Sequence, residues 1–122
     1  MTGFLEDDIV IGRRVNIAQR VLTRRDGRRE LRELVVHPGS VVLLPLLDDG
    51  RLVMERQWRY PLERVMLEFP AGKLERGEAP YTCAVRELAE ETGYTARQWA
   101  RAGVLHNAIA YSDEAIAKAL GT

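Results

Sequence analysis

Hydrophobic and polar residues change their spacing several times along the chain. Residues 14–23 and 29–36 alternate loosely, and the Asp-Gly pair between them is typical of a hairpin turn. Residues 40–47 form a nearly continuous apolar run, which predicts a strand that is buried on both faces. Proline donates no hydrogen bond to a sheet, so Pro45 within that run predicts a bulge or an edge position.

The remaining segments carry weaker signals. Residues 1–12 are mixed and acidic and show little pattern. Residues 114–120 predict a short helix that Gly121 ends. Short strands are expected at residues 52–57, 65–69 and 102–105.

A longer helix is predicted from Pro80 to Gly93. Proline suits the first turn of a helix, and glycine suits a left-handed C-cap. Four residues gather on one face at helical spacing and suit a core. They are Tyr81, Ala84, Val85 and Leu88.

Glutamates occupy another face of this helix. Glu87, Glu90 and Glu91 are spaced i, i+3, i+4 and therefore lie side by side. Like charges at this spacing repel, and a divalent cation with hard oxygen ligands, Mg²⁺ or Mn²⁺, would relieve the repulsion. The alternative from helix geometry alone is an acidic face that is simply solvated.

Composition narrows the classes of protein that remain. A chain of 122 residues forms one domain at most, and its 18 basic residues balance 18 acidic ones. Zero net charge argues against a partner that is a nucleic acid. The single cysteine, Cys83, excludes an intrachain disulfide and is interpreted as a small packing residue. The chain has no apolar segment long enough to span a membrane and no N-terminal signal, which predicts a cytoplasmic protein.

The hairpin at the start of the chain is rich in arginine. Glu30 and Glu33 interleave with these arginines, which favours a solvated surface over a binding patch. The arginines are residues 13, 14, 20, 24, 25, 28, 29 and 32.

The full spacing around the helix resembles the Nudix box, Gly-x5-Glu-x7-Arg-Glu-U-x-Glu-Glu-x-Gly-U, where U is aliphatic. The matching residues are Gly72, Glu78, Arg86, Glu87, Leu88, Glu90, Glu91 and Gly93. Tyr94 departs from the last aliphatic position. The preceding residues 67–71, Leu-Glu-Phe-Pro-Ala, resemble the lead-in of the ADP-ribose pyrophosphatase branch of this family.

The resemblance implies a fold. It is an α/β fold: a Nudix-type α/β/α sandwich with a mixed sheet and an N-terminal β-hairpin subdomain. Residues 1–38 would form the N-terminal strands, a possible dimerisation sheet, and residues 39–122 the Nudix domain. A homodimer is expected. The family's domain continues for several dozen residues, so the C-terminal part is expected to be missing. With it would go a glutamate usually assigned as base or as a further metal ligand. Whether Glu114 replaces it is left open.

The resemblance also implies roles for individual residues. Glu87, Glu90, Glu91 and the Ala71 carbonyl would hold Mg²⁺ or Mn²⁺, while Arg86 would orient the glutamates and Glu78 would be structural.

Around the substrate, Arg59 would face phosphate, with an ion pair to Glu55 or Glu63 as the alternative. Glu68 would contact the substrate, with a charge at the end of a strand as the alternative. Gly72 would also contact the substrate, or would only shape the loop. Trp58 would form part of the substrate site or serve in packing.

The function implied is hydrolysis of the ADP-ribose diphosphate to AMP and ribose 5-phosphate. The cations would neutralise phosphate charge and lower the pKa of a bound water. Two alternatives remain open. The protein could be a Nudix hydrolase of another nucleoside diphosphate sugar or derivative, or an inactive truncated domain that only binds.

Overall fold

The computed structural model describes residues 4–11 and 15–122, with side chains from residue 15 onward. Contacts divide the chain into two compact units. One comprises residues 1–37 with 106–114, and the other comprises residues 38–105 with 115–122. The segment 106–114, which the sequence places with the second half of the chain, thus packs with the N-terminal strands.

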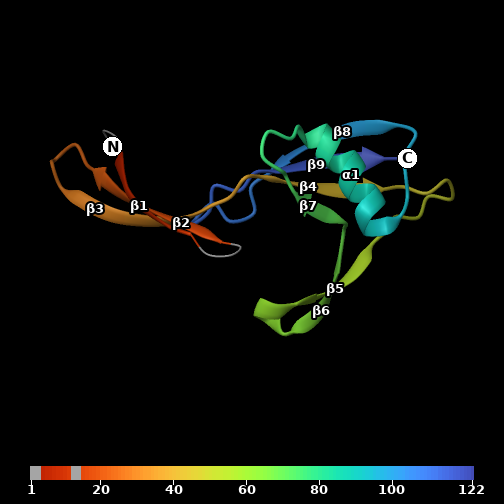
Figure 1. Ribbon diagram of the computed structural model, residues 1–122, viewed down its shortest axis with the longest axis horizontal. Coiled ribbons are helices and arrows are strands. Elements are labelled where there is room, and N and C mark those ends of the chain that lie inside the picture. Colours follow the sequence, from red (N-terminus) through yellow and green to blue (C-terminus); the bar gives the residue numbers. More distant parts are fainter. Residues whose placement is uncertain (1–3, 12–14) are drawn as a thin grey trace. The chain divides into compact units, whose positions relative to one another are not determined.

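The first unit contains a three-stranded antiparallel sheet in the order β1 (Phe4–Ile11), β2 (Asn16–Thr23) and β3 (Arg29–Val36) (Figure 1). Gly27 has a φ of +85°, so the glycine makes the β2–β3 turn at no steric cost. The predicted hairpin is therefore confirmed. Strand β1 was not predicted, because consecutive acidic residues interrupt its alternation.

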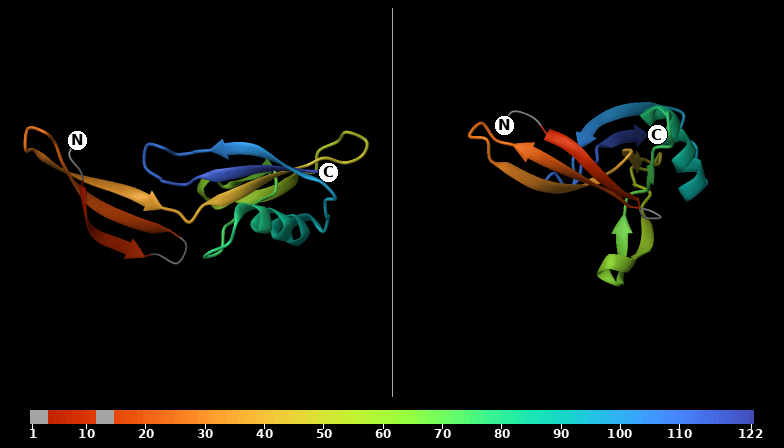
Figure 2. Two further views of the ribbon diagram at one scale, coloured as in Figure 1. Left: turned by 90° about the horizontal axis from the view of Figure 1, so that it is seen from above. Right: turned by 60° about the vertical axis from the view of Figure 1, so that its left-hand side comes forward.

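The second unit is built on a mixed sheet in the order β7 (Ala71–Lys73), β4 (Ser40–Pro45), β9 (Ile116–Gly121) and β8 (Trp99–Leu105). Strands β4 and β9 are parallel, while the other neighbours are antiparallel. Helix α1 (Pro80–Thr92) lies along one face of this sheet (Figures 1 and 2). The mixed sheet with its helix confirms the predicted fold class. The second helical layer of the sandwich is not among the described residues.

The core lies between α1 and β4. Val41 and Leu43 of the strand are fully buried against Cys83, Ala84 and Leu88 of the helix. Burial of these apolar side chains is the main force that holds the helix on the sheet. The helix ends at Gly93 with a φ of +76°, as its C-cap glycine predicts.

The predicted core face of α1 is partly wrong. Tyr81 is 63% exposed and Val85 is 41% exposed. Cys83 and Glu87 are buried in their place. The helix is rotated so that its small residues contact the strand, which brings the backbones of helix and sheet close together.

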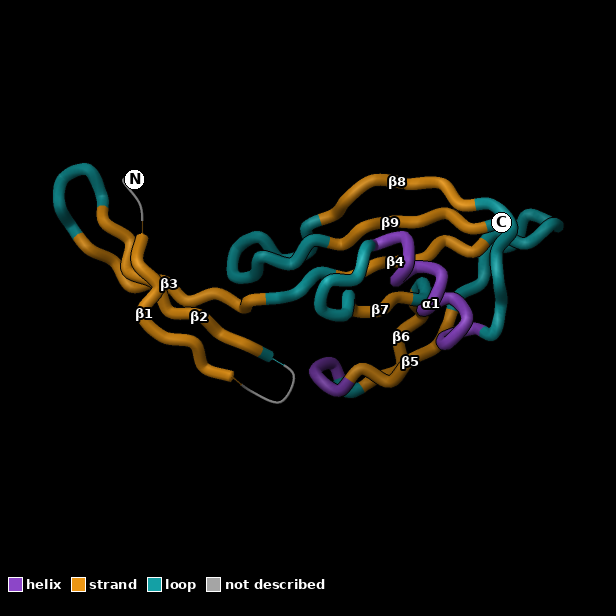
Figure 3. The backbone as a smooth tube through the Cα atoms, turned by 45° about the horizontal axis from the view of Figure 1, so that its top comes forward, coloured by secondary structure: helices purple, strands orange, loops and turns teal. Residues whose placement is uncertain are grey.

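A separate two-stranded hairpin belongs to the same unit. Strands β5 (Glu55–Arg59) and β6 (Arg64–Glu68) pair across the short helix η1 (Tyr60–Leu62) (Figure 3). The sequence predicts residues 52–57 as a return strand for the apolar run. That prediction holds only at the start of the segment, where Leu52 bridges to Leu46 and Val53 N donates to Pro45 O at 2.9 Å. From Glu55 onward the chain pairs with β6 instead.

Two further local predictions are wrong. A helix is expected over residues 114–120, but residues 116–121 form strand β9, since pairing with β4 and β8 on both sides overrides the helix propensity of an alanine-rich segment. Pro45 ends an interior strand instead of lying at an edge. The next residue donates in its place, from Leu46 N to Gly121 O at 2.8 Å.

No helix in the described part of the chain has the length and apolar character needed to cross a bilayer.

Cys83 is fully buried in this core, which fits the packing role that was predicted. Burial is the main cause that raises the pKa of its thiol to about 12. We expect iodoacetamide at pH 8 to leave Cys83 unmodified in the folded protein and to modify it after addition of urea, because alkylation requires an accessible thiolate. Mass spectrometry of the intact protein measures this. Modification of the native protein at the rate of a free thiol would contradict the buried position.

Candidate functional site

The glutamate face of α1 lies against strand β7. Glu87 is only 9% exposed, and its side chain crosses the backbone of Gly72. A Cβ atom at Gly72 would lie 2.0 Å from the Glu87 carboxylate carbon. The glycine is therefore required for the close approach of a buried carboxylate to the strand, and not for an unusual backbone angle.

Arg86 connects the acidic residues of the Nudix-box motif. Its Nε and Nη2 donate to the two carboxylate oxygens of Glu78 at 2.9 and 2.8 Å. Its Nη1 donates to Glu87 at 2.8 Å and to Glu90 at 3.1 Å. Such charge-assisted, two-point pairing fixes the geometry of both partners. One guanidinium thus holds the loop before the helix and two glutamates of the helix in a defined arrangement.

The charges around Arg86 shift two carboxylates in opposite directions. Hydrogen bonds from Arg86 are the largest cause that lowers the pKa of Glu78 to about 2. Burial raises the pKa of Glu87, although its hydrogen bond from Arg86 opposes that shift. Glu78 is therefore firmly ionised, whereas Glu87 is a buried carboxylate for which a further positive charge would be favourable.

Glu78→Gln is expected to reduce the loss of stability in acid. A carboxylate whose pKa is lowered by folding stabilises the protein above its ordinary pKa of 4.5 and loses that contribution as pH falls towards about 2. The variant should therefore be less stable at pH 6, with a thermal midpoint that falls less between pH 5 and pH 2. Circular dichroism melts measure this, with exposed Glu63→Gln as control. Equal slopes for Glu78→Gln and the wild type would contradict the assignment.

Arg59 and Glu68 pair on one face of the β5–β6 hairpin. Arg59 Nε donates to Glu68 Oε2 at 2.6 Å, and Arg59 Nη2 donates to the other oxygen. This pairing lowers the pKa of Glu68 and raises that of Arg59. Two residues expected near the substrate are thus brought together, and the predicted alternative partners, Glu55 and Glu63, do not form this ion pair.

Trp58 lies apart from that pair. Neighbouring residues of a strand point to opposite faces, so Trp58 faces away from Arg59. Its partner across the hairpin is Val65, and the indole is 59% exposed. The structure therefore places Trp58 neither in the core nor on the face that carries Arg59 and Glu68.

Glu55 belongs to the acidic group, although the sequence pattern predicts no such role for it. Burial raises the pKa of Glu55, and a hydrogen bond with the Glu91 side chain raises it further. Glu55 is also the register partner of Glu68. Only the pairing of β5 with β6 reveals this neighbour. The sequence instead predicts that the segment around Glu55 pairs with the apolar run.

These carboxylates fit a hard divalent cation by their chemistry. Glu91 lies close enough to Glu55 to raise the pKa of Glu55, and a cation beside the two side chains would relieve their repulsion. Glu87 is buried, and its side chain fills the space over the backbone of Gly72. In the part of the chain that the structure describes, no three acidic, histidine or cysteine side chains converge as a ready metal cluster. Arg86 donates hydrogen bonds to Glu87 and Glu90.

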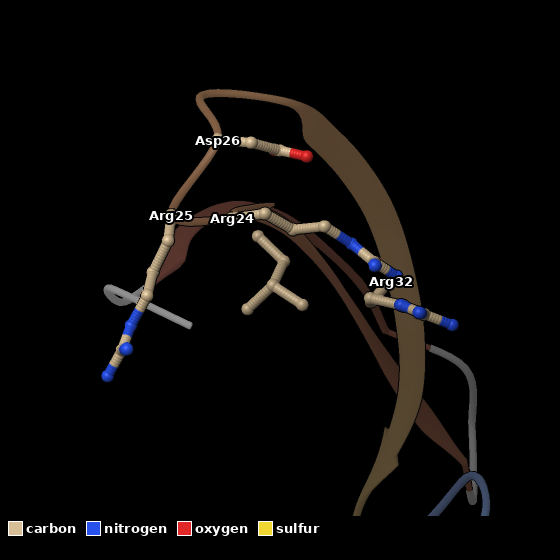
Figure 4. Close-up of a pocket in the computed structure, with 5 residues that line it drawn as sticks. Arg24, Arg25, Asp26 and Arg32 are labelled. Atoms are coloured by element: carbon tan, nitrogen blue, oxygen red, sulfur yellow. The ribbon is translucent and has the colours of Figure 1, made fainter.

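A hollow in the N-terminal unit is lined in part by three arginines, Arg24, Arg25 and Arg32 (Figure 4). Arg24 and Arg32 both pair with Glu30, each at 2.7 Å, and Arg25 points away from them. The acidic partner neutralises much of the local charge. For Arg24 and Arg32 this arrangement agrees with the predicted solvated hairpin surface, while residues 13 and 14 of that prediction lie outside the described part of the chain.

Glu114, left open as a possible base, lies in the same unit. Its carboxylate is 3.7 Å from the imidazole of His37.

A family profile described as NUDIX domain matches residues 36–118 of the chain. The chain belongs to the Nudix family, as the spacing around α1 and the mixed sheet indicate. One relative is the ADP-ribose pyrophosphatase of Bacillus subtilis, which is 39% identical over 111 residues, or 91% of this chain and 60% of that protein. The methanol dehydrogenase activator of Bacillus methanolicus is 42% identical over 92 residues, or 75% of this chain and 50% of the activator.

A third relative is the ADP-ribose pyrophosphatase of Mycobacterium tuberculosis, 39% identical over 75% of this chain and 44% of that protein. A solved structure titled as an ADP compounds hydrolase has the same fold, with a TM-score of 0.81 at 24% identity, and the match covers 98% of this chain and 64% of that one. The chain therefore spans less than two thirds of the length of these relatives.

Proposed function

We propose that the protein is a pyrophosphohydrolase that depends on Mg²⁺ or Mn²⁺ and cleaves ADP-ribose to AMP and ribose 5-phosphate. The observation that carries this proposal is the arrangement of Glu87 over Gly72, with Arg86 fixing the surrounding carboxylates. The names of two relatives, both ADP-ribose pyrophosphatases, support the choice of substrate.

Glu87 and Glu91, with Glu90 and the Ala71 carbonyl, would hold the cation. When bound, the cation would neutralise the diphosphate and favour the attack of water on phosphorus. Arg86 keeps Glu87 and Glu90 oriented, because it bridges both to Glu78. Glu78 is thus a positioning residue in this proposal. Because Glu78 remains ionised, its hydrogen bonds with Arg86 stay charge-assisted.

Arg59 would bind a phosphate of the substrate. Its guanidinium is already paired with a carboxylate, Glu68, which has the same two-oxygen geometry that a phosphate offers. Water attacks one phosphorus, the bond from that phosphorus to the bridging oxygen breaks, and the oxygen leaves with the other phosphate. The attacking water loses one proton, and the products are AMP and ribose 5-phosphate. The protein would act as a homodimer in the cytoplasm.

The test is chromatography of the products after incubation with ADP-ribose and Mg²⁺, with and without EDTA. Release of AMP that EDTA abolishes is the expected result. Release of a nucleoside monophosphate from other nucleoside diphosphate sugars, but not from ADP-ribose, would contradict the proposed substrate. The proposed class of enzyme would still hold. Binding of Mn²⁺ without turnover of any of them would show a domain that only binds.

A further inference from the structure

A hollow of about 440 Å³ lies in the unit that contains α1, beside the first turn of that helix. Its volume falls in the range of sites that bind small molecules. Strand β9 forms its floor through Ala117 and Ala119, whose small side chains leave space above the sheet. None of the residues proposed to act on the diphosphate lines this hollow.

The walls come from α1 and from strand β8. Val104 and Arg101 are the register partners of Ala117 and Ala119, so they stand on the same face of the sheet. Tyr81 closes the hollow from the helix side. This position explains why Tyr81 is exposed although its helical spacing predicts a core residue.

Two aromatic rings form one corner of the hollow. Tyr81 and Trp99 meet edge to face, with centroids 6.2 Å apart and planes at 83°. This is a favourable geometry for aromatic pairs, and a third ring placed beside them would extend it. The lining is therefore apolar and partly aromatic, which suits a planar ring better than a flexible polar ligand.

The charge at the rim has one sign. Arg101 lines the hollow on the same face as Ala119, its register partner, and the described lining includes no acidic side chain. Within the described part of the chain, Arg101 makes no ion pair through its side chain. An exposed guanidinium above an apolar floor is complementary to a carboxylate attached to a ring.

We propose that this hollow binds a small aromatic carboxylate, with its ring over Ala117 and Ala119 and its carboxylate on Arg101. The ring lies between methyl groups and the Tyr81–Trp99 pair, and the anion stays at the solvent-facing rim where Arg101 reaches it. The site is separate from the diphosphate site and does not depend on the proposed hydrolase activity.

Titration of the protein with 2-naphthoate, followed by the indole N–H signals in ¹H–¹⁵N spectra, tests the proposal. The chain has two tryptophans, so the Trp58→Phe variant identifies the Trp99 signal. We expect the Trp99 signal to shift with a Kd of about 1 mM or tighter, since a ligand of this size typically reaches that affinity, while the Trp58 signal stays unchanged. An unchanged Trp99 signal at several millimolar naphthoate would overturn the proposal.

Two variants and a neutral ligand separate the parts of the site. Arg101→Gln should weaken binding of 2-naphthoate about tenfold but leave binding of 2-naphthamide unchanged, because only the acid pairs with the guanidinium. Ala119→Leu should fill the hollow and abolish binding of both ligands. Arg97→Gln, outside the hollow, is the control. Arg101 is exposed, so its variant should fold even if Ala119→Leu does not. Equal weakening of acid and amide by Arg101→Gln would overturn the role of the charge.

Discussion

Glu91→Gln is expected to lower the rate of AMP release from ADP-ribose by roughly 100-fold or more, because it removes one of the proposed cation ligands. Glutamine keeps the size of the side chain, so the helix and its packing should remain intact. Glu91 is exposed on α1 apart from its contact with Glu55, and its replacement leaves the core cluster untouched. Initial rates at saturating Mg²⁺ measure the effect.

A second measurement separates a ligand from a residue that only contributes to folding. The concentration of Mn²⁺ that gives half-maximal binding, followed by electron paramagnetic resonance, should rise at least tenfold in Glu91→Gln. Glu63→Gln is the matched control, because Glu63 is exposed and is not among the described carboxylates that pair with Arg86. Wild-type rates and wild-type Mn²⁺ affinity in Glu91→Gln would remove Glu91 from the site.

The same carboxylate shows what the sequence can and cannot predict about the site. Helical spacing is a local property, so the positions of Glu87, Glu90 and Glu91 on α1 follow directly from the sequence. The neighbour of Glu91 does not. Glu55 reaches it from strand β5, and that contact depends on a pairing of β5 with β6 that the apolar pattern does not specify.

Strand β9 shows the same limit at the level of the fold. Its sequence is rich in alanine and has helix propensity, yet it lies in the sheet between β4 and β8. The small side chains of Ala117 and Ala119 leave room for α1 on that face of the sheet. This requirement comes from tertiary packing and not from the local sequence. The β2–β3 turn, by contrast, was predictable because its Asp-Gly pair fixes the backbone by itself.

Gly72→Ala is expected to lower activity about as much as loss of the Glu87 carboxylate, again on the order of 100-fold. The added Cβ would lie 2.0 Å from Cδ and 2.4 Å from Cγ of Glu87, so the glutamate must leave its place over the strand. It has little room to move, because its side chain is 11% exposed and bound to Arg86. Overpacking of this kind typically costs about 1–3 kcal/mol of stability.

A double-mutant cycle tests whether the two residues act through each other. Gly72→Ala should destabilise the wild type in urea unfolding, but should cost much less in a Glu87→Ala background, because the clashing side chain is then absent. Its effect on the rate should likewise vanish in that background. If Gly72→Ala costs the same in both backgrounds, then the glycine serves the backbone of β7 alone. In that case the close approach of Glu87 is not what the motif's first glycine provides.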